Sequence, residues 1–463
     1  MTEQLKLKLN DSKATRWGAL VIVAFTMMAA YYVNDVVAPL KTMLETDLAW
    51  SGTDFGFFTG GYSFLNVFFL MLIWGGLILD RFGIRFTGKL ATILMVGGTA
   101  LEYYAMTGLA GADATLFGIN EIFGYKTGVF VAFAGYSIFG VGAEVAGITV
   151  SKIIAKWFKG KELATAMGVQ VALARIGSQA GYAVAIPLAR AFGISTPVLL
   201  GLVLLLGGMI AFFIFAVMDK KLDKQMEAAA IAAGTEDEEE KFSFKDVKNI
   251  LVNPGFWLIA LLCVLFYSCV FPFQKFASEL MIIKYGINEN VAGTFAGLPA
   301  LGALILTPVF GGFIDKRGKS ASIMLLGSAM LICVHFIYAI PDINYWLVAI
   351  VLMIILGIAF SLVPSAMWPA VAKIFPVSQL GTAYALIFFI QNIGLWGIPT
   401  LIGWVLDAYC ISGKKPDGTN MYDYTVPMCI FTGIACLSLI VALLLKKADK
   451  KYGYKLEEPN IQK

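Results

Sequence analysis

The chain has 463 residues, of which 59% are hydrophobic and only 14% are charged, and its mean hydropathy is +0.78. This composition excludes an ordinary soluble enzyme and predicts a polytopic membrane protein. The net charge of +4 is small and comes from basic loops, so it gives no indication of nucleic-acid binding.

Twelve apolar segments reach the ~20 residues that a helix needs to cross a bilayer. Lys and Arg gather in the loops on one side of these segments, and basic loops stay cytoplasmic, so we expect both termini in the cytoplasm. The predicted spans are residues 17–40, 54–79, 87–108, 128–152, 163–188, 194–218, 255–283, 289–314, 320–340, 345–372, 379–407 and 424–446.

The first and third spans each contain an acid. Asp35 is the only charged residue of the first span and shares its outer half with Tyr31. Two interpretations of Asp35 stay open: a helix-end carboxylate that reaches the interface, or a cavity-facing group that meets a cationic solute or a proton. For Glu102 in the third span, the position favours an outer-end or structural role.

A short loop occurs twice, as GGLILDRFGIR over 75–85 and as GGFIDKRGKS over 311–320. Repetition of one loop at corresponding points indicates an internal duplication, as in transporters built from parallel repeats. The pair resembles the signature loop of the major facilitator superfamily. This resemblance implies a conformational motif formed by Gly76, Asp80, Arg81 and Gly83 in the first copy and by Gly311, Asp315, Lys316 and Gly318 in the second.

The duplication predicts an all-α membrane protein in which twelve transmembrane helices form two six-helix, pseudo-symmetric halves. We expect the first half over residues 1–218 and the second over 254–446. A charged cytosolic linker over 219–253 would join them, and residues 447–463 would form a cytosolic tail.

The fourth and fifth spans each contain one charge in an apolar run, Glu144 and Arg175. An ionisable group at that depth costs roughly 2.5 to 3.5 kcal/mol, so it faces a partner, a cavity or a substrate. A zwitterionic dipeptide would match both groups, with its amine on Glu144 and its carboxylate held bidentately by Arg175. The alternative is a permanent salt bridge that ties the two helices together.

Longer sequence segments favour the interpretation that Glu144 and Arg175 bind a dipeptide. WFKGKEL at 157–163 and ARIGS at 174–178, together with the runs 256–273 and 367–395, resemble the domain-containing protein one branch of the superfamily. Members of that branch are known as lysosomal dipeptide transporters, so the resemblance implies a peptide solute. It also implies that Glu144 and Arg175 are paired site charges and that Asp35 is the first-helix acid. Lys275 matches no family position clearly, so its role stays open.

The second half adds aromatic faces and polar groups on its seventh, tenth and eleventh spans. Aromatic walls with few polar groups would accept varied side chains, although core packing is the alternative for any single ring. The predicted substrate-binding residues are Tyr31, Asp35, Glu144, Arg175, Tyr267, Gln274, Lys275, Trp368, Gln391 and Asn392.

Other function classes have less support. The chain has one His and lacks HExxH, GxSxG and paired-Cys spacings, so we expect no enzymatic activity, no metal site and no cofactor. A proton-coupled organic anion carrier, in which Arg175 and Lys275 hold a carboxylate, and a non-transporting receptor or scaffold stay as alternatives. Because the outer loops lack an N-x-S/T sequon and the linker is compact, we expect a prokaryotic protein of the bacterial inner membrane without a glycosylated accessory subunit.

Overall fold

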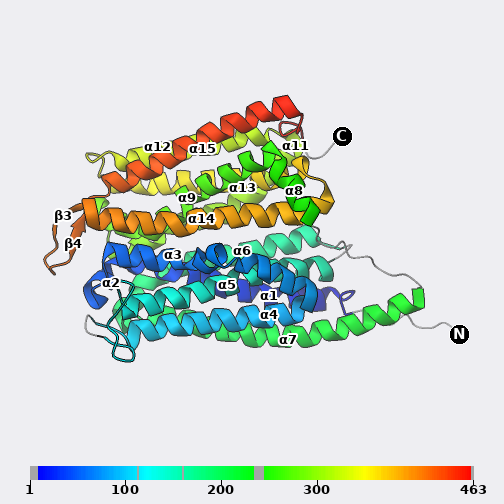
Figure 1. Ribbon diagram of the computed structural model, residues 1–463, viewed down its shortest axis with the longest axis horizontal. Coiled ribbons are helices and arrows are strands. Elements are labelled where there is room, and N and C mark those ends of the chain that lie inside the picture. The colour runs from blue at the N-terminus through cyan, green and yellow to red at the C-terminus, as the bar shows by residue number, and fades with distance from the viewer. Residues whose placement is uncertain (1–8, 112–113, 159–160, 234–243, 460–463) are drawn as a thin grey trace.

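The protein is a bundle of long, roughly aligned helices (Figure 1). The structure is a computed structural model that describes residues 9–111, 114–158, 161–233 and 244–459. Helices of the first half are α1 (Lys13–Val36), η1 (Ala38–Leu40), α2 (Lys41–Leu48), α3 (Gly52–Phe68), α4 (Met71–Thr107), α5 (Thr127–Trp157), α6 (Leu163–Phe192) and α7 (Thr196–Ala233). Those of the second half are α8 (Phe244–Val252), α9 (Pro254–Tyr285), α10 (Glu289–Ala296), α11 (Leu298–Arg317), α12 (Ser320–Ala339), α13 (Trp346–Ile374), α14 (Val377–Tyr409) and α15 (Thr425–Tyr452).

The two ends of the bundle differ. Two antiparallel hairpins, β1 (Glu121–Ile122) with β2 (Tyr125–Lys126) and β3 (Ile411–Lys414) with β4 (Asn420–Tyr422), lie at one end, which we call the hairpin end. At the other end, which we call the linker end, α7 finishes and α8 begins (Figure 1). Helices α1 to α7 lie on one side of the bundle in this view, and most of the later helices lie on the other.

The expected all-α membrane architecture is confirmed. In the described part of the chain, nine helices are long and apolar enough to cross a membrane, or ten when the bent pair of α3 and α4 is taken as one span. That count omits α6 and does not divide α4, which continues through a non-helical residue at Gly83. The predicted number of twelve spans therefore stays a prediction.

Both copies of the signature loop contain a glycine in a conformation that other residues rarely adopt. Gly83 has φ 75° and Gly318 has φ 70°. A residue with a Cβ atom is strained there, and glycine is not, so each loop redirects the chain at its glycine. The chain also bends by 58° between α3 and α4, where Leu70 has φ 53°.

Helices α7 and α15 are among those that extend beyond their predicted spans, because helix-forming polar residues continue them past the apolar region. Helix α7 runs to Ala233 and so enters the predicted linker, of which residues 234–243 lie outside the described residues. Helix α15 runs to Tyr452. The tail then packs on the second signature loop: the Ser320 amide donates to the Leu456 carbonyl at 3.0 Å, and Leu456 is completely buried.

The halves meet closely at the hairpin end. A Cβ atom on Gly56 of α3 would lie 2.5 Å from the Pro399 carbonyl of α14, so only glycine allows this approach. The Asp407 carboxylate of α14 accepts hydrogen bonds from the backbone amides of Gly52 and Thr53 at 3.0 and 2.6 Å. A carboxylate of the second half thus stabilises the positive N-terminal end of the α3 dipole, which belongs to the first half.

A second contact between the halves at this end is a buried charge cluster. Lys41 of α2 forms an ion pair with Glu45 and lies 2.6 Å from a Glu279 oxygen of α9, and both Lys41 and Glu279 side chains are 1% exposed. The Tyr424 hydroxyl donates to the same Glu279 carboxylate. Because buried charges are stable only when they are paired, these contacts hold the hairpin end closed.

Candidate solute-binding cavity

A cavity of about 690 Å³ lies between the halves, within the range of small-molecule sites. Helices α1, α3, α5 and α6 of the first half and α9, α11, α13 and α14 of the second supply most of its lining. The buried charge cluster of Lys41, Glu45 and Glu279 does not take part in the lining. Toward the linker end the cavity reaches the surface, because Ser151 and Val171 both line the cavity and are exposed.

Glu144 lies on the first-half wall because α5 packs closely on α3. A Cβ atom on Gly140 would lie 2.0 Å from the Tyr62 carbonyl, so the two backbones meet there. One turn further along α5, Glu144 accepts a hydrogen bond of 2.9 Å from the Tyr62 hydroxyl. Its hydrogen-bond partner is therefore a neutral phenol, and no cation pairs with this carboxylate among the described residues.

Arg175 is positioned by a similar close approach. A Cβ atom on Gly177 would lie 2.1 Å from the Met28 carbonyl, which brings α6 against α1. The Arg175 guanidinium then lies 5.6 Å from the Tyr31 ring centre and 4.9 Å from that of Phe360. Both rings attract the cation through their π faces. Within the described part of the chain Arg175 has no carboxylate partner, so it is not bonded to Glu144 here.

The hairpin-end floor of the cavity is a polar network. Lys275 of α9 donates to Asp35 of α1 at 3.1 Å and to the Asn34 carbonyl at 2.6 Å. Asp35 also accepts from the Ser178 hydroxyl of α6 and from the Asn34 amide. The Tyr136 hydroxyl of α5 donates to the Asn34 carbonyl at 2.7 Å. This network joins α9 of the second half to three helices of the first.

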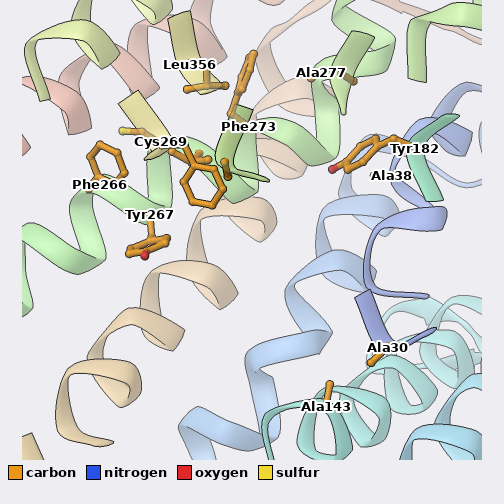
Figure 2. Packing of buried hydrophobic residues seen from close by; sticks show 14 of the residues in the cluster. Ala30, Ala38, Ala143, Tyr182, Phe266, Tyr267, Cys269, Phe273, Ala277 and Leu356 are labelled. Atoms are coloured by element: carbon orange, nitrogen blue, oxygen red, sulfur yellow. The ribbon is translucent and has the colours of Figure 1, made fainter. Parts of the chain in front are cut away.

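The second-half wall is aromatic. Tyr267 and Phe271 stack at 5.5 Å, Phe271 meets Phe360 at 5.3 Å, and Trp368 stacks on Phe388 at 4.8 Å. All five side chains line the cavity. Figure 2 shows the Tyr267 side chain on the opposite side of α9 from Phe273 and Leu356, although all three belong to the buried hydrophobic cluster. Two faces thus meet in one cavity, one polar and one aromatic.

Most of the predicted substrate-binding residues come together in this cavity, and two do not. Asp35 lies behind its surface in the floor network, and Gln274 is buried with its amide directed to the Ala296 carbonyl at 3.3 Å. The eight that line the cavity are Tyr31, Glu144, Arg175, Tyr267, Lys275, Trp368, Gln391 and Asn392.

The signature-loop residues lie away from the cavity, at the linker end. Asp80 forms an exposed ion pair with Lys152 of α5 at 3.1 Å, which ties the two ends of neighbouring helices in one half. Arg81 lies over the Phe82 ring at 5.5 Å. Gly318 packs directly on the tail, because its Cβ position is 2.4 Å from the Glu458 backbone.

Sequence reasoning missed several lining residues. Tyr62 and Tyr136 place phenol hydroxyls on Glu144 and on the floor network, and Phe360 contacts Arg175. The two tyrosines were visible as polar groups in apolar spans. No pattern in the sequence indicated which charged group each would meet.

Comparisons with known proteins agree with this fold. The Major Facilitator Superfamily matches residues 20–399 and 276–458. The Lysosomal dipeptide transporter MFSD1 of Homo sapiens is 29% identical over 454 residues, which cover 95% of this chain and 88% of that protein. Its Danio rerio counterpart is 26% identical over 441 residues, covering 93% and 86%.

Solved transporters have the same architecture at low sequence identity. The nucleoside transporter NupG superposes with a TM-score of 0.68 at 12% identity, covering 92% of this chain and 98% of its own. The inward open xylose transporter XylE from E. coli superposes with a TM-score of 0.64 at 15% identity, covering 93% and 96%. These likenesses bear on the fold alone.

Proposed function

This chain belongs to the major facilitator superfamily and is a multi-pass membrane transporter. From that premise we propose that its solutes are small peptides, mainly dipeptides. In this proposal the halves rock about the solute, so that the hairpin end and the linker end open in turn. Pro272, Pro364 and Pro399 interrupt helices that line the cavity, and such interruptions allow the helices to bend. The curated relatives are named as dipeptide transporters, which supports the choice of solute.

The observation that carries the proposal is that two opposite charges, Glu144 and Arg175, line one cavity without forming an ion pair. Among the described residues Glu144 accepts only from a phenol, and Arg175 lies near two rings, although both line one cavity. Both side chains are half-buried within membrane-spanning helices, where an ionisable group faces a partner, a cavity or a substrate. A dipeptide supplies both missing partners, since its ammonium can pair with Glu144 and its carboxylate can accept two parallel hydrogen bonds from Arg175.

The remaining lining residues fit a solute with variable side chains. The polar wall would hold the termini, which every dipeptide shares. The aromatic wall of Tyr267, Phe271, Phe360, Trp368 and Phe388 offers wide apolar contact, with no charged side chain and with hydrogen-bonding groups only on Tyr267 and Trp368. Such a surface distinguishes poorly between side chains, so we expect broad acceptance of dipeptides.

The alternative of an organic anion carrier requires Lys275 and Arg175 to hold one carboxylate together. Lys275 already donates to Asp35 and to the Asn34 carbonyl in the floor network. Its ammonium is thus occupied by the protein, and among the described residues that line the cavity Arg175 is the cation that stays available to an anion. This occupation favours a solute that has a cationic end as well.

Binding of the termini can be tested directly. We expect purified transporter in proteoliposomes to exchange internal alanyl-alanine for external labelled alanyl-alanine, and we expect excess unlabelled dipeptide to compete. N-acetylated and C-amidated alanyl-alanine should each compete at least about tenfold more weakly, because each lacks one charge-assisted interaction. Free alanine, which cannot span Glu144 and Arg175 with the same spacing of charges, is the control. Equal competition by free and blocked dipeptides would exclude recognition of the termini.

We also propose a cellular location and a membrane orientation for this transporter. The linker end, with both termini, would face the cytoplasm, and the hairpin end would face the outside of a bacterial inner membrane. The basic residues at the linker end support this orientation. The test is a cysteine introduced at Phe117, which is 95% exposed, in a variant whose six native cysteines are replaced by alanine. An impermeant maleimide should label it in intact cells, and labelling only after the cells are opened would contradict the orientation.

A further inference from the structure

The buried charge cluster at the hairpin end has a fourth member, which comes from the β3–β4 hairpin. Lys415 follows strand β3, and its ammonium lies 3.5 Å from a Glu45 oxygen and 3.7 Å from a Glu279 oxygen. Neither of these two oxygens has a hydrogen-bond partner among the described residues. The Lys415 side chain is 15% exposed, and those of the other three members are at most 4% exposed. Lys415 therefore supplies a positive charge to two carboxylate oxygens that otherwise lack a partner.

The four charges of the cluster cancel while the hairpin end is closed. Lys41 and Lys415 contribute the two positive charges. Glu45 and Glu279 contribute the two negative charges. The Tyr424 hydroxyl, which donates to Glu279, is neutral. Because a buried charge without a counter-charge is strongly disfavoured, closure requires equal numbers of positive and negative charges in this cluster.

The cluster also divides evenly between the two halves of the protein. Lys41 and Glu45 are one turn apart on α2 of the first half, and they pair with each other. Glu279 on α9 and Lys415 both belong to the second half, where they form a second pair. Each half therefore keeps one charge of each sign when the halves separate, so opening leaves no excess charge on either face.

Both strands of the β3–β4 hairpin contribute to this cluster. The centre of the Tyr422 ring on β4 lies 4.5 Å from the Lys41 ammonium. Lys415 begins the turn of the hairpin, where its amide donates to the Thr419 carbonyl at 2.8 Å. Asp417 in the same turn also interacts with Lys415, but it is exposed and accepts from Thr419, so it lies outside the buried charge balance. The hairpin is thus part of the contact between the halves.

We propose that the β3–β4 hairpin is a latch that fastens the hairpin end, with Lys415 as the charge that completes the closed cluster. Without the Lys415 charge, the closed cluster would hold one excess negative charge where water is excluded. In the open form water enters between the separated faces and solvates the same excess charge. The closed form is therefore destabilised more than the open form, and the equilibrium shifts toward opening.

The test measures the distance across the hairpin end in the full-length protein, in lipid nanodiscs without solute. Spin labels are attached to cysteines introduced at Asp47 of α2 and at Asp342 between α12 and α13, after the six native cysteines are replaced by alanine. Both positions are exposed, and they belong to opposite halves. By double electron–electron resonance, we expect Lys415→Met to raise the ratio of open to closed populations at least about tenfold. Lys414→Met is the matched control, because Lys414 is exposed on the same hairpin and donates to Asn420 outside the cluster, so it should match the parent.

Further variants distinguish charge balance from the loss of a side chain. Glu45→Gln leaves one excess positive charge and should also open the hairpin end, so it replaces Lys415→Met should that variant fail to fold. Lys415→Met combined with Glu45→Gln restores the balance and leaves the pair of Lys41 and Glu279. This double variant should return to the distance distribution of the parent.

Two results would overturn the latch: Lys415→Met with the distance distribution of the parent, or a double variant that is more open than either single variant. The latch acts whatever solute the cavity binds, and these distances are measured without solute. Failure of dipeptide exchange would therefore refute the proposed solute and leave the latch standing, whereas an unchanged distance in Lys415→Met would refute the latch and leave dipeptide transport standing.

Discussion

Arg175 distinguishes solute binding from structural pairing, because the two interpretations predict opposite effects of the same substitutions. A buried salt bridge between Glu144 and Arg175 would lose about 3–5 kcal/mol of stability when either charge is removed. The structure shows no such bridge: Arg175 contacts the rings of Tyr31 and Phe360, and Glu144 accepts from Tyr62. Neutralising either residue thus leaves no newly unpaired charge, and the losses are a cation–π contact or part of one hydrogen bond. We expect Glu144→Gln and Arg175→Gln to change the free energy of unfolding by less than about 2 kcal/mol.

Solute binding should respond much more strongly than stability. Arg175→Lys keeps the positive charge but can no longer donate two parallel hydrogen bonds to a carboxylate. Loss of one charge-assisted hydrogen bond costs about 1.5–3 kcal/mol, so the dissociation constant for alanyl-alanine should rise roughly 10- to 150-fold. The double variant, Glu144→Gln with Arg175→Gln, should fold well and fail to exchange dipeptides, because neither terminus of the solute finds a charge.

The assay measures both properties on the same preparations. Thermal unfolding in detergent gives stability, titration calorimetry gives dipeptide affinity, and proteoliposomes matched for protein content give exchange rates. The reasoning is refuted if each single variant is destabilised by several kcal/mol and the double variant recovers stability and exchange together. It is equally refuted if Arg175→Lys binds alanyl-alanine as tightly as the parent.

Two further substitutions test the closure of the hairpin end and the packing of the tail. Gly56→Leu should disfavour the closed form by about 1–3 kcal/mol, roughly 5- to 150-fold, and slow dipeptide exchange, because its Cβ would meet the Pro399 carbonyl. The control is Gly97→Ala, whose Cβ meets no atom within 4 Å and which should exchange as the parent does. Leu456→Ala should destabilise the protein by about 2–5 kcal/mol in thermal unfolding, since Leu456 is fully buried, whereas Leu443→Ala at a position 44% exposed should cost less than about 1 kcal/mol; equal losses would contradict a packed tail.

The sequence predicted the features that depend on composition and on local chain geometry. Apolar length predicted the multi-pass helical architecture, although the predicted span 54–79 is broken between α3 and α4. The repeated loop located two places where the chain turns sharply, because Gly83 and Gly318 occupy backbone conformations that favour glycine. Single charges in apolar runs likewise identified Glu144 and Arg175 as cavity residues, since the cost of burial leaves few other positions for them.

The sequence could not predict which side chains the tertiary packing brings into contact. Lys275 had no assignable role from its own span, and its contact with Asp35 joins residues 240 positions apart. The predicted hairpin of α5 and α6 placed Glu144 and Arg175 at similar depth, but depth does not determine which ring or hydroxyl each side chain meets. The neighbours Tyr62 and Phe360 come from α3 and α13, one on each side of the bundle.

The cavity and its floor differ in how the protein satisfies its own charges. In the floor, Lys275 and Asp35 satisfy each other across the two halves, so their pairing contributes to closure and has to be broken for the hairpin end to open. In the cavity, Glu144 and Arg175 are left with neutral neighbours, so the energy of pairing them is still available to a solute. A zwitterion that satisfies both charges gains this energy without weakening the floor. A solute that instead competed for Lys275 would have to displace Asp35 and would weaken the closure, so the two charge pairs favour zwitterions over simple anions.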